Sequence, residues 1–484
     1  MFGTKSYALL FGLATLATVG LAKHEGSSAA QAVEATRAEA SGESFSSPQL
    51  VVDAELVGPD APAQLEAPAW PQRSYVRGED LAALLTVEED GRATLSGRTF
   101  GGKQASGEGF AFTGERRADG SLALSAPAPA PHKGLRWFLD GLDGERATPE
   151  PLTATLTPGA DGAFCGTLLG REVSSAPAPD TSDLVALVVP GLSTNLWNQY
   201  GIPYLDENLG VFAARGIEAR RVAINTEVGV DENAATIAAA LREVVAQGKR
   251  VLLFAHSKGG ADTVTALTDP ANADLLPQVA GFVAIQPVFS GARISDGIDS
   301  GELIAFVTKV RHEKLAKVAE KAVRSATNAA FEHLLPLLNR EDDHGSRLAW
   351  SDLRSADRQA ALAARPFPAD RIPTVTVRSS FSGRRLLRME LPDGERKFRL
   401  GKNALRTPLV VFQRFVEGHY GEANDGMVSL SAQAIPGAAA DVVYENLDHF
   451  EPGVRGESPV TPSRLTQDAL DEVLPRLKAP AVQR

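Results

Sequence analysis

One serine lies where a predicted strand turns sharply into a predicted helix. The segment Val251–His256 is rich in β-forming residues, and Ser257 follows it directly. Small residues flank the serine, with Ala255 two positions before it and Gly259 two positions after it, as a strained strand-to-helix turn requires. The free N–H groups and positive dipole end of the following helix would point at the serine. The spacing therefore predicts a nucleophile.

The same turn has a purely structural interpretation, in which Ser257 caps a helix in a glycine-rich connection. The usual pattern around such a nucleophile is Gly-x-Ser-x-Gly, and Ala255 replaces its first glycine. Short motifs also occur by chance, so the catalytic interpretation depends on suitable partners elsewhere in the chain.

An acid and a base follow Ser257 in the sequence. Asp425 lies in the polar loop 419–428, and His449 lies at the end of the predicted strand 441–447. The other seven histidines lack this placement after an acid loop and at a strand end. A hydroxyl, an imidazole and a carboxylate can act as nucleophile, general base and orienting acid.

Two residues next to these candidates compete with them. Asp448 directly precedes His449, but adjacent side chains on a strand point to opposite faces, which favours Asp425 as the acid. His256 directly precedes Ser257 and is expected to point away from the reacting side of the turn.

Two backbone N–H groups are candidates for stabilising a tetrahedral oxyanion. One belongs to Lys258, the first residue after the serine. The other belongs to Leu192, in the loop Pro190-Gly191-Leu192 that follows the apolar run 184–189. A plain strand-to-helix turn is the alternative interpretation of that loop.

The elements around these residues alternate between strands and helices. Strands are predicted at 184–189, 220–225, 251–256, 279–285, 372–378 and 441–447, and helices at 205–215, 231–247, 261–267 and 407–417. Asp231 is expected to cap the second helix. This alternation predicts right-handed βαβ units and a mostly parallel sheet flanked by helices, with its carboxyl edge carrying the candidate residues.

The segment 293–364 departs from that rhythm and is predicted to be mostly helical. A helical insertion here is placed to cap the site, and a surface feature away from it is the alternative. An inserted hairpin is expected at 386–400, turned by Pro392-Asp393-Gly394.

The region before residue 183 divides into three parts. Residues 1–22 have the positive start and short apolar run of an export signal, with cleavage expected after Ala22 and an uncleaved membrane anchor as the alternative. Residues 23–48 indicate a flexible tether. Residues 49–175 indicate a small β-rich domain with a strand at 50–57, hairpins at 109–125 and 153–168, and either a packing role or a surface- or polymer-binding role.

Composition excludes several classes of partner and site. The chain of 484 residues carries a net charge of −11, which argues against a nucleic-acid partner. Cys165 is the only cysteine, so an intramolecular disulfide and a cysteine-based metal cluster are both impossible. The export signal predicts a periplasmic, cell-surface or extracellular protein, with membrane association if the signal is not cleaved.

Taken together, the Pro-Gly-Leu loop, the Ala-His-Ser-Lys-Gly-Gly turn, Asn-Asp-Gly-Met-Val and Leu-Asp-His resemble the bacterial lipase and esterase branch of the α/β-hydrolase superfamily. The resemblance covers residues 183–454, within a hydrolase domain expected at 183–478. It implies an eight-stranded, mostly parallel sheet and ester hydrolysis without cofactor or metal; a Ca²⁺ site of some relatives has no clear ligand cluster here. On that pattern Ser257 is the nucleophile, His449 the base and Asp425 its orienting acid, with Leu192 and Lys258 as oxyanion donors.

The chain departs from the family pattern at two positions. Pro190 stands where many relatives have histidine, and Ala255 stands where they have glycine. Neither change removes a reacting group.

The substrate expected is a small-molecule or lipid ester. The alternatives are a polyester, thioester or amide substrate, or a non-catalytic binding or scaffolding protein on the same fold.

Overall fold

The computed structural model describes most of the chain between Trp70 and Lys478. The described residues are 70–102, 104–127, 151–159, 163–192, 194, 202–316, 346–382, 400–456 and 458–478, without the side chains of 310–316, 346–348 and 400–408. The export signal, the tether, the predicted strand 50–57 and residues 386–399 of the predicted hairpin lie outside them. Contacts divide the chain into two units, and the larger comprises Trp70–Val307, Pro336–Glu390 and Arg406–Arg484.

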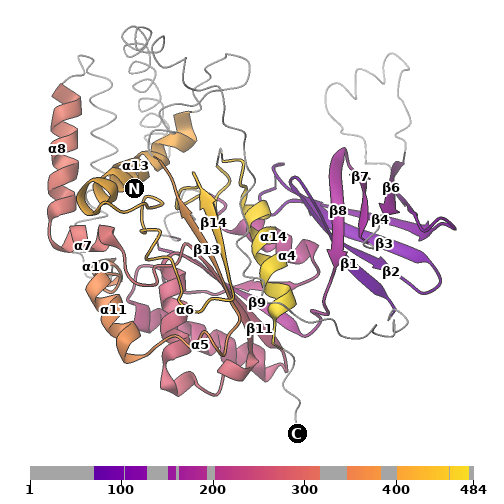
Figure 1. Cartoon of the computed structure of the whole chain (residues 1–484), viewed down its shortest axis with the longest axis horizontal. Helices are drawn as coiled ribbons and strands as arrows, with labels where there is room; N and C mark the ends of the chain where they lie inside the picture. Colours follow the sequence, from indigo (N-terminus) through magenta and orange to yellow (C-terminus); the bar gives the residue numbers. More distant parts are fainter. Residues whose placement is uncertain are drawn as a thin grey trace, which may run out of the picture. The chain divides into compact units, whose positions relative to one another are not determined.

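Eight antiparallel strands close into a barrel at the start of this larger unit (Figure 1). They are β1 (Gln72–Gly78), β2 (Leu81–Val87), β3 (Arg92–Thr99), β4 (Glu108–Arg116), β5 (Leu122–Ala126), β6 (Leu152–Pro158), β7 (Phe164–Leu168) and β8 (Arg171–Pro177). The two predicted hairpins are confirmed as β4–β5 and β6–β7. Closure comes from the pairing of β8 with β1, in which Ser74 lies opposite Pro177.

Side chains fill the barrel interior. Exposed and buried positions alternate along β3, so that Ala93 and Leu95 point inward, as the period of a strand requires. Gly97 continues that inward row, and a Cβ there would lie 2.4 Å from the Cβ of Ala83. The barrel is therefore a packed apolar core of its own. Cys165 on β7 is a free, exposed thiol.

A parallel sheet of six strands follows the barrel. Its strands are β9 (Leu184–Val189), β10 (Glu218–Arg221), β11 (Arg250–His256), β12 (Val279–Ile285), β13 (Thr374–Ser380) and β14 (Ala440–Glu445), in the order β10-β9-β11-β12-β13-β14. The inner strands β9, β11 and β12 are buried along their whole length, as expected of strands covered on both faces. The described sheet thus has six strands where the family resemblance implied eight.

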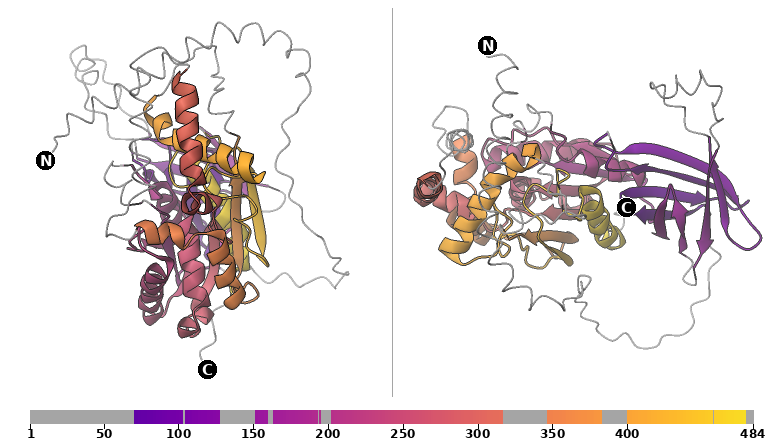
Figure 2. Two further views of the ribbon diagram at one scale, coloured as in Figure 1. Left: turned by 90° about the vertical axis from the view of Figure 1, so that its left-hand side faces the viewer. Right: turned by 90° about the horizontal axis from the view of Figure 1, so that it is seen from above.

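The described α-helices are α4 (Asp206–Ala214), α5 (Val230–Ala246), α6 (Lys258–Thr268), α7 (Arg293–Asp299), α8 (Glu302–Ala316), α10 (Ser346–Ser351), α11 (Ser355–Ala364), α13 (Leu400–Tyr420) and α14 (Pro462–Val473). Helices α5 and α6 pack against one face of the sheet, and α4 and α14 pack against the other (Figures 1 and 2). Side chains at odd positions of β11, such as Leu253, join the cluster formed with α5 and α6. Phe254 points the other way and meets Phe212 of α4 edge to face, with ring centroids 5.2 Å apart.

Three element boundaries differ from the sequence predictions. Helix α5 begins at Val230 after Gly229, so Asp231 lies in the first turn and is not the cap. Strand β10 ends at Arg221, short of the predicted residue 225, because its neighbour β9 ends at Val189. Helix α6 begins at Lys258 instead of residue 261, leaving no linker after the serine.

The described part of segment 293–364 is helical, in α7, α8, α10 and α11. Residues 317–345 lie outside the described part of the chain. The placement of this segment as a cap over the site stays a prediction. None of the helices in the described ranges combines the length and apolar character needed to cross a bilayer.

Candidate active site

Ser257 occupies the turn between β11 and α6 with a backbone that few L-residues adopt. Its φ is 58° and its ψ is −126°, a conformation that persists only where the surroundings enforce it. The Ser257 N–H donates to the carbonyl of Ile285 at 3.0 Å, and its carbonyl accepts from the N–H of Val288 at 3.2 Å. The neighbouring strand β12 and the loop after it therefore hold the turn from one side.

Glycines allow the close packing around this turn. A Cβ on Gly259 would lie 2.5 Å from the carbonyl oxygen of Pro190, and one on Gly260 would lie 2.6 Å from Pro287. A Cβ on Gly191 would lie 2.8 Å from the Cβ of Ser257. The loop after β9 is thus packed directly against the serine.

The structure brings together the three residues predicted from the sequence. Nε2 of His449 lies 2.7 Å from Oγ of Ser257, and Nδ1 of His449 lies 2.8 Å from Oδ2 of Asp425. All three side chains are buried. Because a carboxylate only accepts hydrogen bonds, Nδ1 carries the proton in the neutral imidazole, and Nε2 is left to accept from the serine hydroxyl.

Backbone and side-chain donors fix the carboxylate of Asp425. Its Oδ1 accepts from the N–H groups of Met427 at 2.9 Å and Val428 at 2.8 Å. Its Oδ2 accepts from Nε2 of Gln433 at 3.1 Å as well as from His449. Gln433 was not predicted from the sequence, because no local pattern marks a glutamine that reaches back eight residues.

The carboxylate of Asp448, the competing acid, accepts hydrogen bonds from nearby backbone N–H groups. Its Oδ1 accepts from the N–H groups of Phe450 at 2.9 Å and Glu451 at 3.1 Å. These bonds shape the loop that carries His449. The structure places Asp425, and not Asp448, against the imidazole.

Parallel strand ends explain why such distant residues meet. Ser257 follows β11, and His449 follows β14, so both lie at the carboxyl edge of one sheet, where open parallel sheets place their sites. The acid loop is tied to the same edge, because the N–H of Phe381 donates to the carbonyl of Asn424. The N–H of His449 also donates to the carbonyl of Asp425, at 2.9 Å.

The two predicted oxyanion donors both flank Ser257. Lys258 follows it at the start of α6, and Leu192 lies one residue after Gly191, which touches the serine. Within the described part of the chain, neither backbone N–H donates to another protein atom. These two N–H groups therefore remain available to an oxygen bound beside the serine.

The Lys258 side chain points away from this chemistry and into the protein. Its ammonium donates to both carboxylate oxygens of Asp262, at 2.8 and 3.0 Å, and both residues are buried. Asn233 of α5 donates to the same carboxylate. Burial raises the pKa of Asp262 to about 6, against the opposing effect of Lys258. Lys258 thus offers the site its backbone and not its charge.

A second buried histidine, His256, lies next to Ser257 and close to His449. Its Nδ1 is 2.6 Å from the hydroxyl of Tyr204, and its Nε2 is 3.1 Å from the carbonyl oxygen of His449. As expected, its ring hydrogen bonds avoid Ser257. Neither Tyr204 nor this contact was predicted, because the sequence gives no local sign that they meet.

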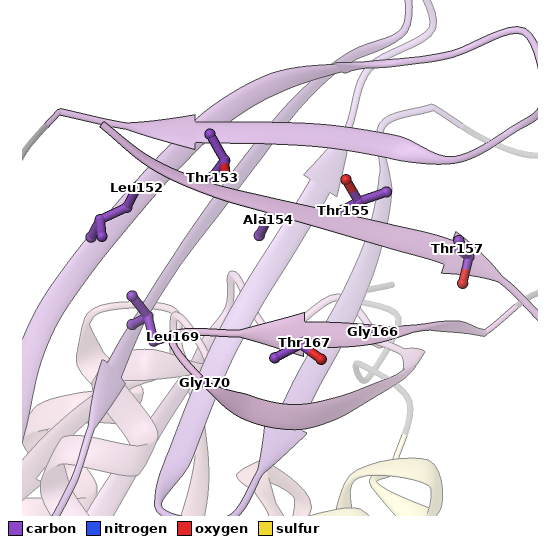
Figure 3. A pocket seen from close by; sticks show the side chains of 9 residues that line it. All are labelled: Leu152, Thr153, Ala154, Thr155, Thr157, Gly166, Thr167, Leu169 and Gly170. Atoms are coloured by element: carbon purple, nitrogen blue, oxygen red, sulfur yellow. The ribbon is translucent and has the colours of Figure 1, made fainter. Parts of the chain in front are cut away.

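Within the described ranges, no three His, Cys, Asp or Glu side chains gather where they could hold a metal ion. A pocket over β6 and β7 of the barrel is drawn in Figure 3. It is lined by Leu152, Thr153, Ala154, Thr155, Thr157, Gly166, Thr167, Leu169 and Gly170. It has no titratable side chain, so we assign it no reaction.

Known proteins match this chain in structure and not in sequence. No protein-family model matches the sequence, and no curated protein matches it either. Similar solved structures include a metagenomic carboxyl esterase, with 19% identity, a TM-score of 0.41 and coverage of 62% of this chain and 78% of the other. A mature lipase from Bacillus licheniformis is 17% identical, with a TM-score of 0.38 and coverage of 62% of this chain and 96% of the other. Lipase 1 from Pelosinus fermentans is 12% identical, with a TM-score of 0.34 and coverage of 60% of this chain and 98% of the other. Likenesses at these TM-scores carry no argument about chemistry.

A parallel sheet with helices on both faces presents a strained serine between a central strand and a helix. Aspartate and histidine follow later in the chain and meet that serine at the same sheet edge. This sheet, turn and chain order are the features of an α/β-hydrolase.

Proposed function

We propose that this protein is a serine hydrolase that cleaves carboxylic esters through an acyl-enzyme. The observation that carries the proposal is the continuous line of hydrogen bonds from Ser257 through His449 to Asp425. A buried serine, an imidazole and a carboxylate in that order form a nucleophile with its base and orienting acid.

The first half of the reaction follows from this geometry. Oγ of Ser257 attacks the ester carbonyl while its proton passes to Nε2 of His449. The carbonyl oxygen becomes an oxyanion, and the N–H groups of Leu192 and Lys258 are the donors proposed to receive it. Collapse of the tetrahedral intermediate breaks the bond to the alcohol, which leaves with the proton from His449.

Water completes the cycle by the same route. His449 removes a proton from water, the resulting hydroxide attacks the acyl carbonyl, and Ser257 leaves with the proton returned by His449. Asp425 holds the imidazole in one tautomer and stabilises the imidazolium formed in each half. With the ester and one water molecule as the reactants, these steps balance.

The experiment that tests the proposal uses the full chain and its serine variant. The protein should hydrolyse short p-nitrophenyl esters and should be labelled by a fluorophosphonate at Ser257. Ser257→Ala should lose labelling and lose turnover by several orders of magnitude, roughly 10⁶-fold where such a triad acts as a unit. Ester turnover in Ser257→Ala equal to that of the parent would end the proposal.

A substrate panel then separates esters from related acyl compounds. Polyesters, thioesters and amides can follow the same acyl-enzyme route, and they differ in the leaving group that His449 must protonate. We expect esters to be cleaved faster than amides, because an alcohol leaves more easily than an amine. Export through residues 1–22 is also proposed, and cell fractionation with sequencing of the mature N-terminus tests it.

A further inference from the structure

Tyr204 and His256 form a buried hydrogen-bonded pair that has no part in the reaction described above. Both side chains are buried behind the serine. The Tyr204 hydroxyl lies 2.6 Å from Nδ1 of His256 and accepts from the N–H of Gly191 at 2.9 Å. Polar groups buried in a protein almost always have a hydrogen-bond partner, and each member of this pair has one.

The surrounding oxygens decide which nitrogen of His256 carries the proton. Its Nε2 faces two oxygens at 3.1 Å, the carbonyl of His449 and Oε1 of Gln286. The orientation of the Gln286 amide is itself fixed, because its Nε2 donates to the carbonyl of Asp448. Two acceptors require a donor between them, so Nε2 is protonated. The neutral ring therefore accepts at Nδ1 from the Tyr204 hydroxyl.

The pair connects the two sides of the candidate site. At one end, Tyr204 engages the N–H of Gly191, and the N–H of Leu192, the next along the loop, has no acceptor among the described residues. At the other end, His256 donates to the backbone carbonyl of His449. One continuous path of hydrogen bonds thus runs from the oxyanion loop to the base.

The backbone of Tyr204 is fixed to the same region. The N–H of Leu205 donates to the carbonyl of Gly453 at 2.8 Å, in the loop after His449. A Cβ on Gly453 would lie 2.5 Å from the Tyr204 ring. The tyrosine is therefore fixed at both its backbone and its hydroxyl, so it can hold the loop at Gly191 in one position.

We propose that Tyr204 and His256 are positioning residues that hold the oxyanion loop and the catalytic base in register around Ser257. The inference rests on the proposed ester hydrolysis and assigns that site two further residues. Their effect acts through Gly191 and His449, since neither side chain hydrogen-bonds Ser257. A loose oxyanion loop penalises the transition state more than substrate binding.

The test compares Tyr204→Phe, His256→Gln and the double variant in ester hydrolysis and in fluorophosphonate labelling. Tyr204→Phe removes the acceptor for Gly191 and the donor to His256. We expect kcat and the labelling rate to fall roughly 10- to 100-fold, below the 10²–10³ of a direct oxyanion donor, with KM nearly unchanged. His256→Gln keeps an N–H donor at the position of Nε2, which can reach the carbonyl of His449, but it has no acceptor at the position of Nδ1 for the Tyr204 hydroxyl. The double variant should lose no more than Tyr204→Phe alone, because the shared bond is already absent.

Tyr444→Phe is the matched control. Its hydroxyl donates to Asp468 at 2.7 Å, so the same atom and one hydrogen bond are lost between β14 and α14. The control should lower thermal stability and leave kcat unchanged. A folded Tyr204→Phe with the parent's kcat, or losses that add fully in the double variant, would overturn the inference. An inactive parent protein would instead overturn the proposed function, so the two failures are distinguishable.

Discussion

The carboxylate of Asp425 accepts from Nδ1 of His449 at 2.8 Å, although Asp448 is the acid next to that histidine in the chain. The two acids differ in what holds them. Asp425 is fixed by the N–H groups of Met427 and Val428, whereas Asp448 caps the turn at Phe450. Position in space, and not proximity in sequence, decides which carboxylate lies against the imidazole.

Asp425→Asn is expected to leave the protein folded and to lower kcat by about 10⁴-fold. An amide at this position presents an N–H or a weaker acceptor to Nδ1, so the imidazole loses its preferred tautomer and the stabilisation of its charged form. Ester turnover measured over a range of substrate concentrations checks this. Asp448→Asn is the matched control and should retain activity close to that of the parent, because an amide oxygen can still accept from Phe450. The reverse order of the two losses would contradict the assignment.

Gly259→Ala is expected to disrupt the turn at the serine. The added Cβ would lie 2.5 Å from the backbone oxygen of Pro190, which cannot move as a flexible side chain could. We expect a loss of about 1–3 kcal/mol in the free energy of unfolding and a large drop in kcat. Urea denaturation and turnover measure the two effects.

Gly418→Ala serves as the control for that substitution. Gly418 lies in α13, and a Cβ added there would meet no neighbouring atom within 4 Å. Alanine in an open helical position stabilises by about 0.5–1 kcal/mol relative to glycine. A Gly259→Ala protein as stable and active as Gly418→Ala would show that the turn tolerates a side chain.

Acid should destabilise the parent protein through His256. Burial, with a smaller contribution from repulsion by His449, lowers the pKa of His256 from 6.5 to about 3. Between these values the unfolded chain binds a proton that the folded protein does not, so stability falls as the pH decreases through that window. The slope from this group is about 1.4 kcal/mol for each pH unit.

His256→Gln removes this titrating group, so comparing the variant with the parent separates the contribution of His256 to the pH dependence from that of all other titrating groups. Unfolding free energies of both proteins should be measured from pH 7 to pH 4. The variant should be less stable than the parent at pH 7, and the difference between the two should shrink as the pH falls. A constant difference across the range would mean that His256 titrates alike in the folded and unfolded chains.

Arg455→Ala is expected to weaken the attachment of the loop that follows His449. The guanidinium bonds Asp80, in the turn between β1 and β2, and Glu207 of α4. Burial lowers the pKa of Arg455, but these hydrogen bonds outweigh it and raise the pKa above its usual value. Since its side chain is 26% exposed, we expect a loss of about 1–3 kcal/mol, less than for a fully buried pair.

Denaturant unfolding of Arg455→Ala checks this value, with Arg92→Ala as the control. Arg92 pairs with Asp90 on the exposed surface of the barrel, and its removal should leave stability close to that of the parent. Equal stability of the two variants would mean that the Arg455 bonds do not contribute to folding.

Local patterns in the sequence predicted the elements that carry the candidate site. Ala255 and Gly259 around Ser257 predicted a tight turn, and the structure has a positive φ at that serine. The prediction of the turn succeeded because it depends on backbone conformation within a few residues. The preference for Asp425 over Asp448 agrees with the contact between Asp425 and His449, although its stated reason does not apply, because β14 ends at Glu445 and both Asp448 and His449 lie in the loop after it.

Long-range contacts account for what the sequence did not reveal. Helix α5 begins at Val230 because its N–H donates to Asp352, from a different part of the chain, which replaces the local cap expected from Asp231. The barrel closes through β1 and β8, whose pairing leaves no local signature. Tyr204 and Gln433 likewise reach the site only through the tertiary fold.

The order of the sheet has a consequence for when activity can arise. The histidine comes from beyond β14, the edge strand that pairs only with β13 among the described strands. A nascent chain that has emerged as far as β13 already holds Ser257 but still lacks Asp425 and His449. Under the proposed mechanism, hydrolysis begins only after the last strand is synthesised and docked, so recovery of ester turnover during refolding would report the arrival of that strand.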